Sequence, residues 1–356
     1  MDKIKKKLIK LIDKNSNGIL LSHFINCCLF DKDGYYNKKN PIGTKGDFIT
    51  APEISQLYGE IIGLYILNTW NNKINSKINY IELGPGKGTL TNDIFRITKK
   101  FQDFQNSVDL YFIEINELLR KFQKENINIS SNKKNIYFWL DKFNIKNKYP
   151  SIIIANEFFD CFSIDQYIKP NKVWLEKRIK YNNIDDKFFL FNSKIKDLEF
   201  FEKIKKNFDY DISRNLIIEY SKTREKYFKK LCKHIKKNKG VIIISDYGYK
   251  KQPNHSTLLS YQLHNQVNIL ENPGNQDITS HVDFNSFIKI SKSYKLNCIF
   301  STQRDFLINH GINERLKNIK NKNNKIDTNI IENGYHKLVD NDKMGNLFKF
   351  LIVSSY

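Results

Sequence analysis

Three glycines alternate with other residues in the stretch Tyr80 to Phe95, which reads YIELGPGKGTLTNDIF. Gly84, Gly86 and Gly88 follow a short apolar run and precede a segment with helical spacing of apolar residues. Glycine has no Cβ and adopts positive φ easily, so a ligand can approach the backbone of such a turn closely. The spacing excludes a P-loop, which needs G-x-x-x-x-G-K-[ST], and it differs from the dinucleotide pattern G-x-G-x-x-G. The stretch predicts a strand, a glycine-rich turn and a helix in that order.

The residues around this turn predict a βαβ unit. Ile78 to Ile81 has the length of a buried strand, Thr89 to Phe101 has helical spacing, and Val108 to Ile113 is a second strand. Glu114 follows that strand, where a Rossmann-like fold presents a carboxylate to the two hydroxyls of a ribose. The alternatives are that Glu114 only flanks the helix predicted over Ile115 to Asn126, and that the glycine turn is purely structural. With turn and acid together, we expect the ribose role.

Further apolar runs extend the predicted sheet. They lie at 136–139, 151–155, 240–245, 298–302 and 347–354. Strands that alternate with helices indicate a parallel, doubly wound α/β sheet with ligands at the carboxyl ends of its strands. Roughly eighty residues separate Phe159 from Gly240, where one helix would suffice. We expect this insertion, between the fourth and fifth strands, to hold strand-like hairpins, a strand with Glu219 and a helix over 223–237.

These elements divide the chain into three predicted parts. They are an N-terminal helical extension over 1–75, a core formed by 76–160 and 240–356, and an inserted lobe over 161–239 that would recognise the substrate or a partner. The basic start, MDKIKKKLIKLI, predicts a surface helix and not a transit peptide, because it contains Asp2 and no Arg. The segment 316–325, LKNIKNKNNK, is predicted to be a loop from its low complexity.

The charge balance bears on the partner. The chain has 59 Lys and Arg against 38 Asp and Glu, a formal net charge of +21, which is the usual signature of a nucleic-acid partner. Only seven of the basic residues are Arg, the residue that binds phosphate bidentately, so we expect a solvated lysine surface and no specific nucleic-acid site. No apolar run approaches the roughly 20 residues of a membrane span. Five cysteines without C-x-x-C spacing predict neither zinc nor disulfides, which fits a cytoplasmic protein.

The segment NEFFD, Asn156 to Asp160, follows the fourth predicted strand and carries candidate catalytic residues. Asn156 and Phe159 resemble part of the N-P-P-[YF] motif of amino-group methyltransferases, but Glu157 and Phe158 replace its prolines. Acids at a strand end favour binding of a guanidinium, because its planar fork pairs with carboxylates. The alternative is a helix N-terminus at which the acids complement the helix dipole.

His281, in SHVDF, is a second candidate for the chemistry. It follows Asp277 and Thr279 and precedes a helical stretch. A histidine in such a loop could position or deprotonate a nucleophile. It could equally cap the helix that begins at Asp283.

Seven segments, in this order, resemble the MidA-type methyltransferase family. They are KGDFITAPEISQLYGEIIG (45–63), ELGPGKGTL (82–90), ANEFFD (155–160), SDYGY (245–249), NPGNQDITSHVDF (272–284), QRDFLINHGI (303–312) and MGNLFKFLI (344–352). The resemblance covers nearly the whole chain. It implies the class I S-adenosyl-L-methionine (SAM) methyltransferase fold, a Rossmann-like seven-stranded sheet, with SAM as cofactor. As in characterised mitochondrial members, it also implies protein-arginine N-methylation connected with assembly of respiratory complex I (NADH dehydrogenase).

The resemblance also implies roles for the residues of the glycine turn. Gly84, Gly86 and Gly88 would face the methionine part of SAM, after Glu82, and Glu114 would face its ribose.

Further cofactor contacts are implied at Asp47, Thr50, Glu53 and Asn156. For Glu53 the alternative is a capping box with Thr50 at the start of a helix through Trp70.

Methylation of arginine needs a carboxylate, because the guanidinium is charged at neutral pH and its lone pairs are delocalised. We expect Glu157, helped by Asp160 or Glu219, to bind the guanidinium and localise its charge away from the attacking nitrogen. No metal is needed for this transfer.

Other classes stay open. A methyltransferase acting on nucleic acid or a small molecule would use the same SAM site, and a non-catalytic assembly factor would bind SAM without turnover. The expected partner is a protein substrate, such as a complex I subunit. The segment to Asn40, together with the insertion, could support a homodimer.

Overall fold

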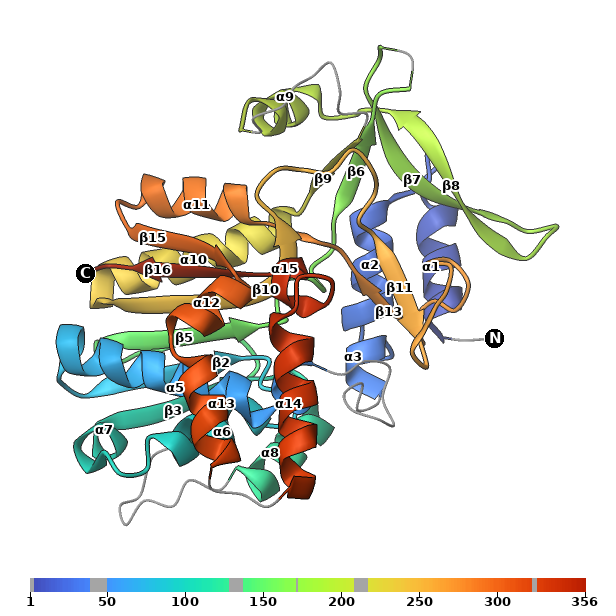
Figure 1. The fold of residues 1–356 in the computed structure, drawn as a ribbon. Coiled ribbons are helices and arrows are strands. Elements are labelled where there is room, and N and C mark those ends of the chain that lie inside the picture. The colour runs from blue at the N-terminus through green and yellow to red at the C-terminus, as the bar shows by residue number, and fades with distance from the viewer. Residues whose placement is uncertain (1–2, 39–49, 128–136, 171, 208–216, 322–324) are drawn as a thin grey trace. The chain divides into compact units, whose positions relative to one another are not determined.

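The computed structural model describes residues 3–38, 50–127, 137–170, 172–207, 217–321 and 325–356 (Figure 1). The chain forms two compact units. The first unit comprises Met1–Pro41, Phe159–Phe228 and Tyr249–Lys289, and the second comprises Ile42–Phe158, Lys229–Gly248 and Ile290–Tyr356. Each unit is described by itself below.

The second unit is built on a mostly parallel sheet. Its strands follow one another in the order β15 (Asn297–Thr302), β16 (Phe348–Ser354), β10 (Gly240–Tyr249), β5 (Ser151–Asn156), β2 (Ile78–Leu83), β3 (Val108–Ile113) and β4 (Tyr137–Leu140). The pairs from β10 to β4 are parallel, and β16 is antiparallel to both of its neighbours. All residues of β2 and β3 are buried, as expected for parallel strands covered on both faces. The predicted α/β fold is confirmed.

The helices of the second unit precede or connect its strands. They are α4 (Ala51–Ile54), α5 (Gln56–Thr69) with a π turn at Trp70–Ile74, α6 (Thr89–Ile97), α7 (Gln102–Asn106), α8 (Glu117–Asn126), α12 (Gln303–Asn309), α13 (Ile312–Lys320), α14 (Lys325–Val339) and α15 (Met344–Leu347). Helix α10 (Lys222–Asn238) begins in the first unit and continues in the second.

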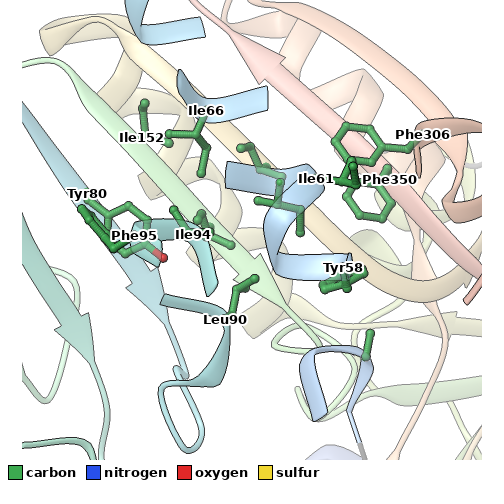
Figure 2. Packing of buried hydrophobic residues seen from close by; sticks show 14 of the residues in the cluster. Tyr58, Ile61, Ile66, Tyr80, Leu90, Ile94, Phe95, Ile152, Phe306 and Phe350 are labelled. Atoms are coloured by element: carbon green, nitrogen blue, oxygen red, sulfur yellow. The ribbon is translucent and has the colours of Figure 1, made fainter. Parts of the chain in front are cut away.

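The core of the second unit joins α5 and α6 to the sheet. Figure 2 shows Ile61 of α5, Ile94 of α6 and Phe350 of β16 among its buried side chains. Gly59 allows the two helices to approach, because a Cβ there would lie 2.5 Å from Asp93 Cβ. Burial of such apolar surface is the main favourable term in folding.

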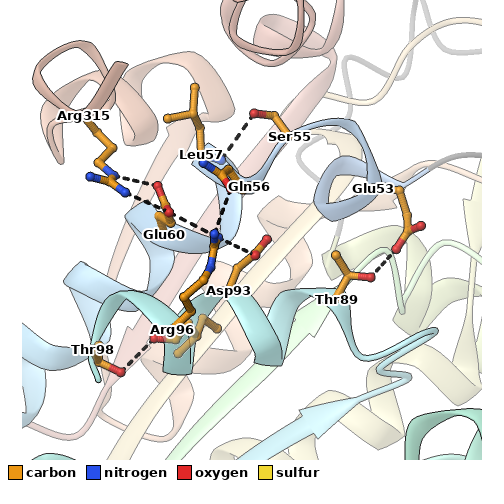
Figure 3. A network of polar contacts seen from close by, with 11 residues as sticks. Glu53, Ser55, Gln56, Leu57, Glu60, Thr89, Asp93, Arg96, Thr98 and Arg315 are labelled. Atoms are coloured by element: carbon orange, nitrogen blue, oxygen red, sulfur yellow. Dashed lines mark hydrogen bonds and ion pairs between the residues drawn. The ribbon is translucent and has the colours of Figure 1, made fainter. Parts of the chain in front are cut away.

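A buried acid also ties three helices of the second unit together. Glu60 of α5 is 1% exposed and pairs with Arg315 of α13 through Nε at 2.7 Å and with Arg96 of α6 through Nη2 at 3.2 Å (Figure 3). A buried charge needs such partners, since its desolvation is otherwise costly. This network is structural.

The first unit is mainly antiparallel. Its larger sheet has the order β1 (Ile19–Leu20), β7 (Leu175–Asn182), β6 (Asp165–Ile168) and β9 (Ile217–Tyr220), with β8 (Lys187–Lys194) paired to β7. A smaller sheet contains β12 (Asn265–Gln266), β11 (Leu259–Gln262) and β13 (Asp277–Thr279). The remaining elements are α1 (Lys3–Asp13), α2 (Leu21–Phe30), α3 (Tyr35–Lys38), α9 (Leu198–Asn207), β14 (Val282–Asp283) and α11 (Phe284–Ser293), which runs into the second unit. The hairpin and helix expected of the insertion are present.

Two local predictions are wrong. The helix expected to run from Thr50 through Trp70 breaks at Ser55, whose Oγ accepts a hydrogen bond from Leu57 N at 3.3 Å and caps α5. The structure records no cap bond from the Thr50 side chain, so the capping box with Glu53 is not formed. The loop expected over 316–325 is helical through Lys320, the end of α13.

Within the described ranges, the structure contains no helix that is both long and apolar enough to cross a membrane.

Candidate active site

The glycine turn lies between the end of β2 and the start of α6. Gly84, Gly86 and Gly88 have φ of 61°, 56° and 81°, the left-handed region that favours glycine. A Cβ at Gly88 would lie 2.6 Å from Cγ1 of Ile127, and one at Gly84 would lie 3.1 Å from the Phe158 ring. The backbone conformation therefore favours glycine at all three positions, and the close contact favours it most at Gly88. The turn forms a cradle of backbone before a helix N-terminus, which suits a ligand with polar groups.

Glu114 follows β3, next to β2 in the sheet. Its Oε1 accepts a hydrogen bond from Asn116 N at 2.9 Å, and its Oε2 lies 3.4 Å from Gln123 Nε2. Burial raises the pKa of this carboxyl, and the bonds from Asn116 and Gln123 oppose that rise. Asn116 is the N-cap of α8, so Glu114 is not needed as its cap. The Ile115 backbone also donates to this carboxylate, so three donors leave at least one acceptor position of Glu114 for a ribose hydroxyl.

Gln123 connects the acid to the glycine turn, and the sequence analysis missed it. Its Nε2 donates to Gly86 O at 2.7 Å and faces Glu114, while its Oε1 accepts from Trp139 Nε1 at 2.9 Å. The side chain is fully buried. The signal in the sequence was a glutamine one helical turn after Leu119, on the apolar face of α8. Gln123 fixes the turn relative to the carboxylate.

Glu53 and Glu82 accept hydrogen bonds from residues in and around the turn. Glu53 accepts hydrogen bonds from Thr89 Oγ1 (Figure 3) and from Lys87 Nζ, the latter at 3.1 Å, so it secures the end of the turn. Glu82 accepts hydrogen bonds on one oxygen, Oε2, from Tyr80 Oη at 3.0 Å and from Thr91 Oγ1. Burial raises the pKa of Glu82 to about 7, although both hydroxyls lower it.

The end of β5 presents the first two residues of NEFFD. Asn156 Oδ1 accepts from Tyr58 Oη, and its Nδ2 lies 3.3 Å from Glu157 Oε1. Glu157 has φ of 47°, which is unfavourable for a residue with a side chain and is typical of functional positions. Its Oε1 accepts from Ala51 N at 2.9 Å, and its N donates to Ser245 O at 2.8 Å. These bonds hold the carboxylate at a strand end.

In the second unit the structure therefore brings five groups of predicted residues to the carboxyl ends of adjacent strands. They are Glu82 near the end of β2 with the glycine turn after it, Glu114 after β3, Asn156 at the end of β5 with Glu157 after it, Glu53 beside the turn, and Thr50 before α4. Asp47 lies outside the described residues.

Asp160 and His281 lie together in the first unit. Asp160 Oδ2 accepts from Thr279 Oγ1 at 3.2 Å, and Asp160 O accepts from Ser280 N at 3.0 Å. The cap of α11 is Asp283, whose Oδ1 accepts from Ser286 N at 3.1 Å. His281 is therefore not that cap.

Arg224 holds these two segments, and nothing in the sequence analysis indicated it. Its Nε donates to Phe159 O at 2.9 Å and its Nη1 to His281 O at 2.9 Å. Its Nη2 donates to Ser280 Oγ at 2.9 Å and lies 3.4 Å from Asp160 O. Arg224 is 6% exposed, and its planar fork matches carbonyls on both segments.

The Glu219 carboxylate accepts all of its recorded hydrogen bonds from residues of the first unit. Its Oε1 accepts from Gln166 Nε2 at 2.7 Å, Ser256 Oγ at 3.1 Å and Thr257 N at 3.0 Å. Its Oε2 accepts from Thr257 Oγ1. The residue is 5% exposed. Four hydrogen bonds support a structural role, because a buried carboxylate needs such donors.

Comparisons with known proteins agree with this geometry. Residues 61–301 match the model of a family described as "Putative S-adenosyl-L-methionine-dependent methyltransferase". The chain is 29% identical to the protein arginine methyltransferase NDUFAF7, mitochondrial, of Xenopus laevis, over 96% of this chain and 82% of that protein. It is 27% identical to the Homo sapiens protein of the same name, over 89% of this chain and 75% of that protein.

The fold is also found in a solved structure. A Burkholderia thailandensis protein described as a "likely methyl transferase", bound to S-adenosyl-homocysteine, superposes with a TM-score of 0.83. The two are 20% identical, over 99% of this chain and 91% of the other.

Proposed function

The chain belongs to the family of S-adenosyl-L-methionine-dependent methyltransferases, and from this premise we propose that it methylates arginine side chains of a protein. The observation that carries the cofactor site is the glycine turn with three positive φ values, joined through Gln123 to Glu114. The relatives named as protein arginine methyltransferases support the choice of substrate. Glu157, a carboxylate at the end of β5, supports it independently.

The residues present fit SAM. A cradle without Cβ atoms at the end of β2 admits the close approach of the methionine part, and the Glu114 oxygens suit the ribose hydroxyls. When bound, SAM supplies a methyl group that is attached to a sulfonium. The sulfur then leaves as a neutral thioether. The protein's task is then to hold the accepting nitrogen in line with the methyl carbon and to exclude water, and such orientation supplies roughly 7 to 11 kcal/mol in favourable cases.

Glu157 is assigned to the nucleophile. A guanidinium nitrogen has a delocalised lone pair, so it attacks poorly until its charge is held away from it. The Glu157 carboxylate would pair with the other nitrogens and accept the proton that the methylated nitrogen loses. Its strained backbone and its bond from Ala51 N fix it for that role. We leave Glu219 out of this role because its oxygens are already bonded.

The substitution Glu157→Gln tests this assignment. We expect methyl transfer to fall by about 100-fold or more, because general acid–base groups contribute at least that much, while SAM affinity stays unchanged. Glu125→Gln, which alters an exposed acid of α8, is the matched control. Full transfer by Glu157→Gln with unchanged SAM affinity would remove Glu157 from the mechanism.

Transfer of radiolabelled methyl from SAM into an extract of the source cells tests the function itself. Gly86→Val is the control, since a β-branched residue at φ of 56° is strained and should abolish SAM binding. Label that resists nuclease and is removed by protease supports a protein substrate. Label removed by nuclease would favour a nucleic-acid methyltransferase, and SAM binding without label would favour a non-catalytic assembly factor.

We further propose a class of substrate, a location and an oligomeric state. The resemblance to relatives connected with complex I assembly suggests a subunit of that complex as the substrate. A cytoplasmic location and a homodimer are likewise predictions, which fractionation of the source cells and the solution mass of the purified protein would test.

A further inference from the structure

A cavity of about 320 Å³ lies within the first unit. Its lining comes from α2, β6, β7, the segment before α9 and the start of α10. None of the residues to which we assign SAM binding or methyl transfer lines it. Its size is at the lower end of the range for small-molecule sites in proteins. The cavity is therefore a separate candidate for ligand binding.

The lining contains a buried hydroxyl without a partner. Ser163 is 2% exposed, and its Oγ forms no hydrogen bond within the described part of the chain. The backbone of Ser163 is fixed, since its O accepts a hydrogen bond from Ser221 Oγ at 2.6 Å. Few buried polar atoms in native proteins stay unpaired, and such an atom often marks a missing ligand or water. A guest in the cavity would supply the partner.

The lining also contains a carboxylate without an ion pair. Asp165 Oδ1 accepts from Ser22 N at 3.1 Å, and no cation forms an ion pair with Asp165 among the described residues. Burial raises the pKa of Asp165, and hydrogen bonds from Ser22 together with the charge of the nearby His23 oppose this rise without cancelling it. A buried carboxylate is stabilised when a cation pairs with it.

Arg178, the arginine of the lining, does not supply that cation. Arg178 is 7% exposed, and its Nε lies 2.6 Å from Glu176 Oε1, so these two charges neutralise each other. Arg178 Nη1 also donates to Gly18 O at 3.1 Å. Asp165 is thus left as the uncompensated charge among the less exposed lining residues.

The exposed lining residues include two lysines and one acid, Asp197, whose Oδ1 accepts a hydrogen bond from Phe200 N at 2.9 Å. Lys196 and Lys222 are exposed, and the Lys222 Nζ lies 5.1 Å from the centre of the Phe200 ring. A ligand that enters would therefore meet the two ammonium groups at the exposed part and the half-buried Asp165 carboxylate near the Ser163 hydroxyl deeper in the lining. We propose that this cavity binds a small zwitterion, with its ammonium or guanidinium group at Asp165 and Ser163 and its carboxylate at Lys196 and Lys222.

Calorimetric titration of the full chain tests the proposal with three probes. L-Arginine carries both charges, agmatine lacks the carboxylate, and succinate lacks the cation. We expect L-arginine to bind more tightly than agmatine, and succinate not to bind. Asp165→Asn should weaken L-arginine binding by about tenfold or more, as expected when a hydrogen bond to a charged group is lost. Asp185→Asn, at an exposed position between β7 and β8, should leave it unchanged.

A second variant separates the two ends of the ligand and protects the test from misfolding. Lys222→Gln alters an exposed residue, so the fold should persist. It should weaken L-arginine binding by about 3-fold, as for an exposed ion pair, and leave agmatine binding unchanged. The proposal is overturned if Asp165→Asn binds L-arginine like the natural chain, if succinate binds in place of L-arginine, or if none of the probes binds. The readout is binding, so it does not depend on the proposed methyl transfer.

Discussion

Glu82 should make the stability of the protein depend on pH. The pKa of its buried carboxyl is raised from 4.5 to about 7, mainly by burial, so between these values the folded state holds a proton that the unfolded state releases. The contribution of Glu82 to the free energy of unfolding should therefore be fully present below pH 4.5. It should be lost as the pH rises through about 7. This rise in the pKa lowers the free energy of unfolding by about 3 kcal/mol at pH 8, relative to its value below pH 4.5.

The variant Glu82→Gln should remove this dependence. Tyr80 and Thr91 both donate to a single oxygen of Glu82, so the amide oxygen of Gln can accept both bonds without ionising. We expect urea unfolding to show the variant more stable than the natural protein at pH 8, by up to about 3 kcal/mol, and equal to it near pH 4.5.

The control for this experiment is Glu125→Gln, at an exposed acid. Its difference from the natural protein should not change over the same pH range. A constant difference between Glu82→Gln and the natural protein from pH 5 to 8 would refute the reasoning.

Three further substitutions test the geometry. Gly88→Ala should lower stability by at least about 1 to 2 kcal/mol in urea unfolding, because of its φ of 81° and the nearby Ile127 side chain, and an undiminished stability would contradict the turn geometry. Gln123→Leu should weaken SAM binding in calorimetry by about tenfold or more, since Glu114 loses a donor, whereas unchanged affinity would exclude its positioning role. Arg224→Lys should lower stability by about 2 kcal/mol or more in urea, because an ammonium cannot reproduce the planar fork, and equal stability would show that the fork is dispensable.

Much of the second unit could be predicted because its elements are local. Continuous apolar runs such as 151–155 and 240–245 predict buried parallel strands, and the alternating glycines predict the turn after β2. The polar residues just past those strands then fall at one edge of the sheet. The position of each residue relative to its strand was therefore sufficient to predict this part of the site.

Contacts between distant segments could not be predicted. The capping pattern at Thr50 was overridden by Glu53, which is bonded instead to Lys87 and Thr89, more than thirty residues away. The helix α13 could not be recognised from the low-complexity segment at 316–325. Asn and Lys residues separate Ile312 and Ile319, the apolar residues that α13 buries.

The first unit shows the same limit more strongly. Residues 1–41, 159–228 and 249–289 form it together, although no composition shift marks them as one unit. Arg224 contacts residues more than fifty positions away on either side, and no local spacing announces such a clamp. Glu219 was a candidate from its position on a strand, but its role depends on Gln166 and Thr257 beside it.

The central claim is that this methyltransferase acts on arginine in a protein. The direct measurement is amino-acid analysis of the protein that becomes labelled when the purified chain and radiolabelled SAM are incubated with an extract of the source cells. We predict that acid hydrolysis releases the label as methylarginine, and that Glu157→Gln removes this signal without loss of SAM binding. Label in another amino acid, or none in protein while SAM binds, would contradict the account.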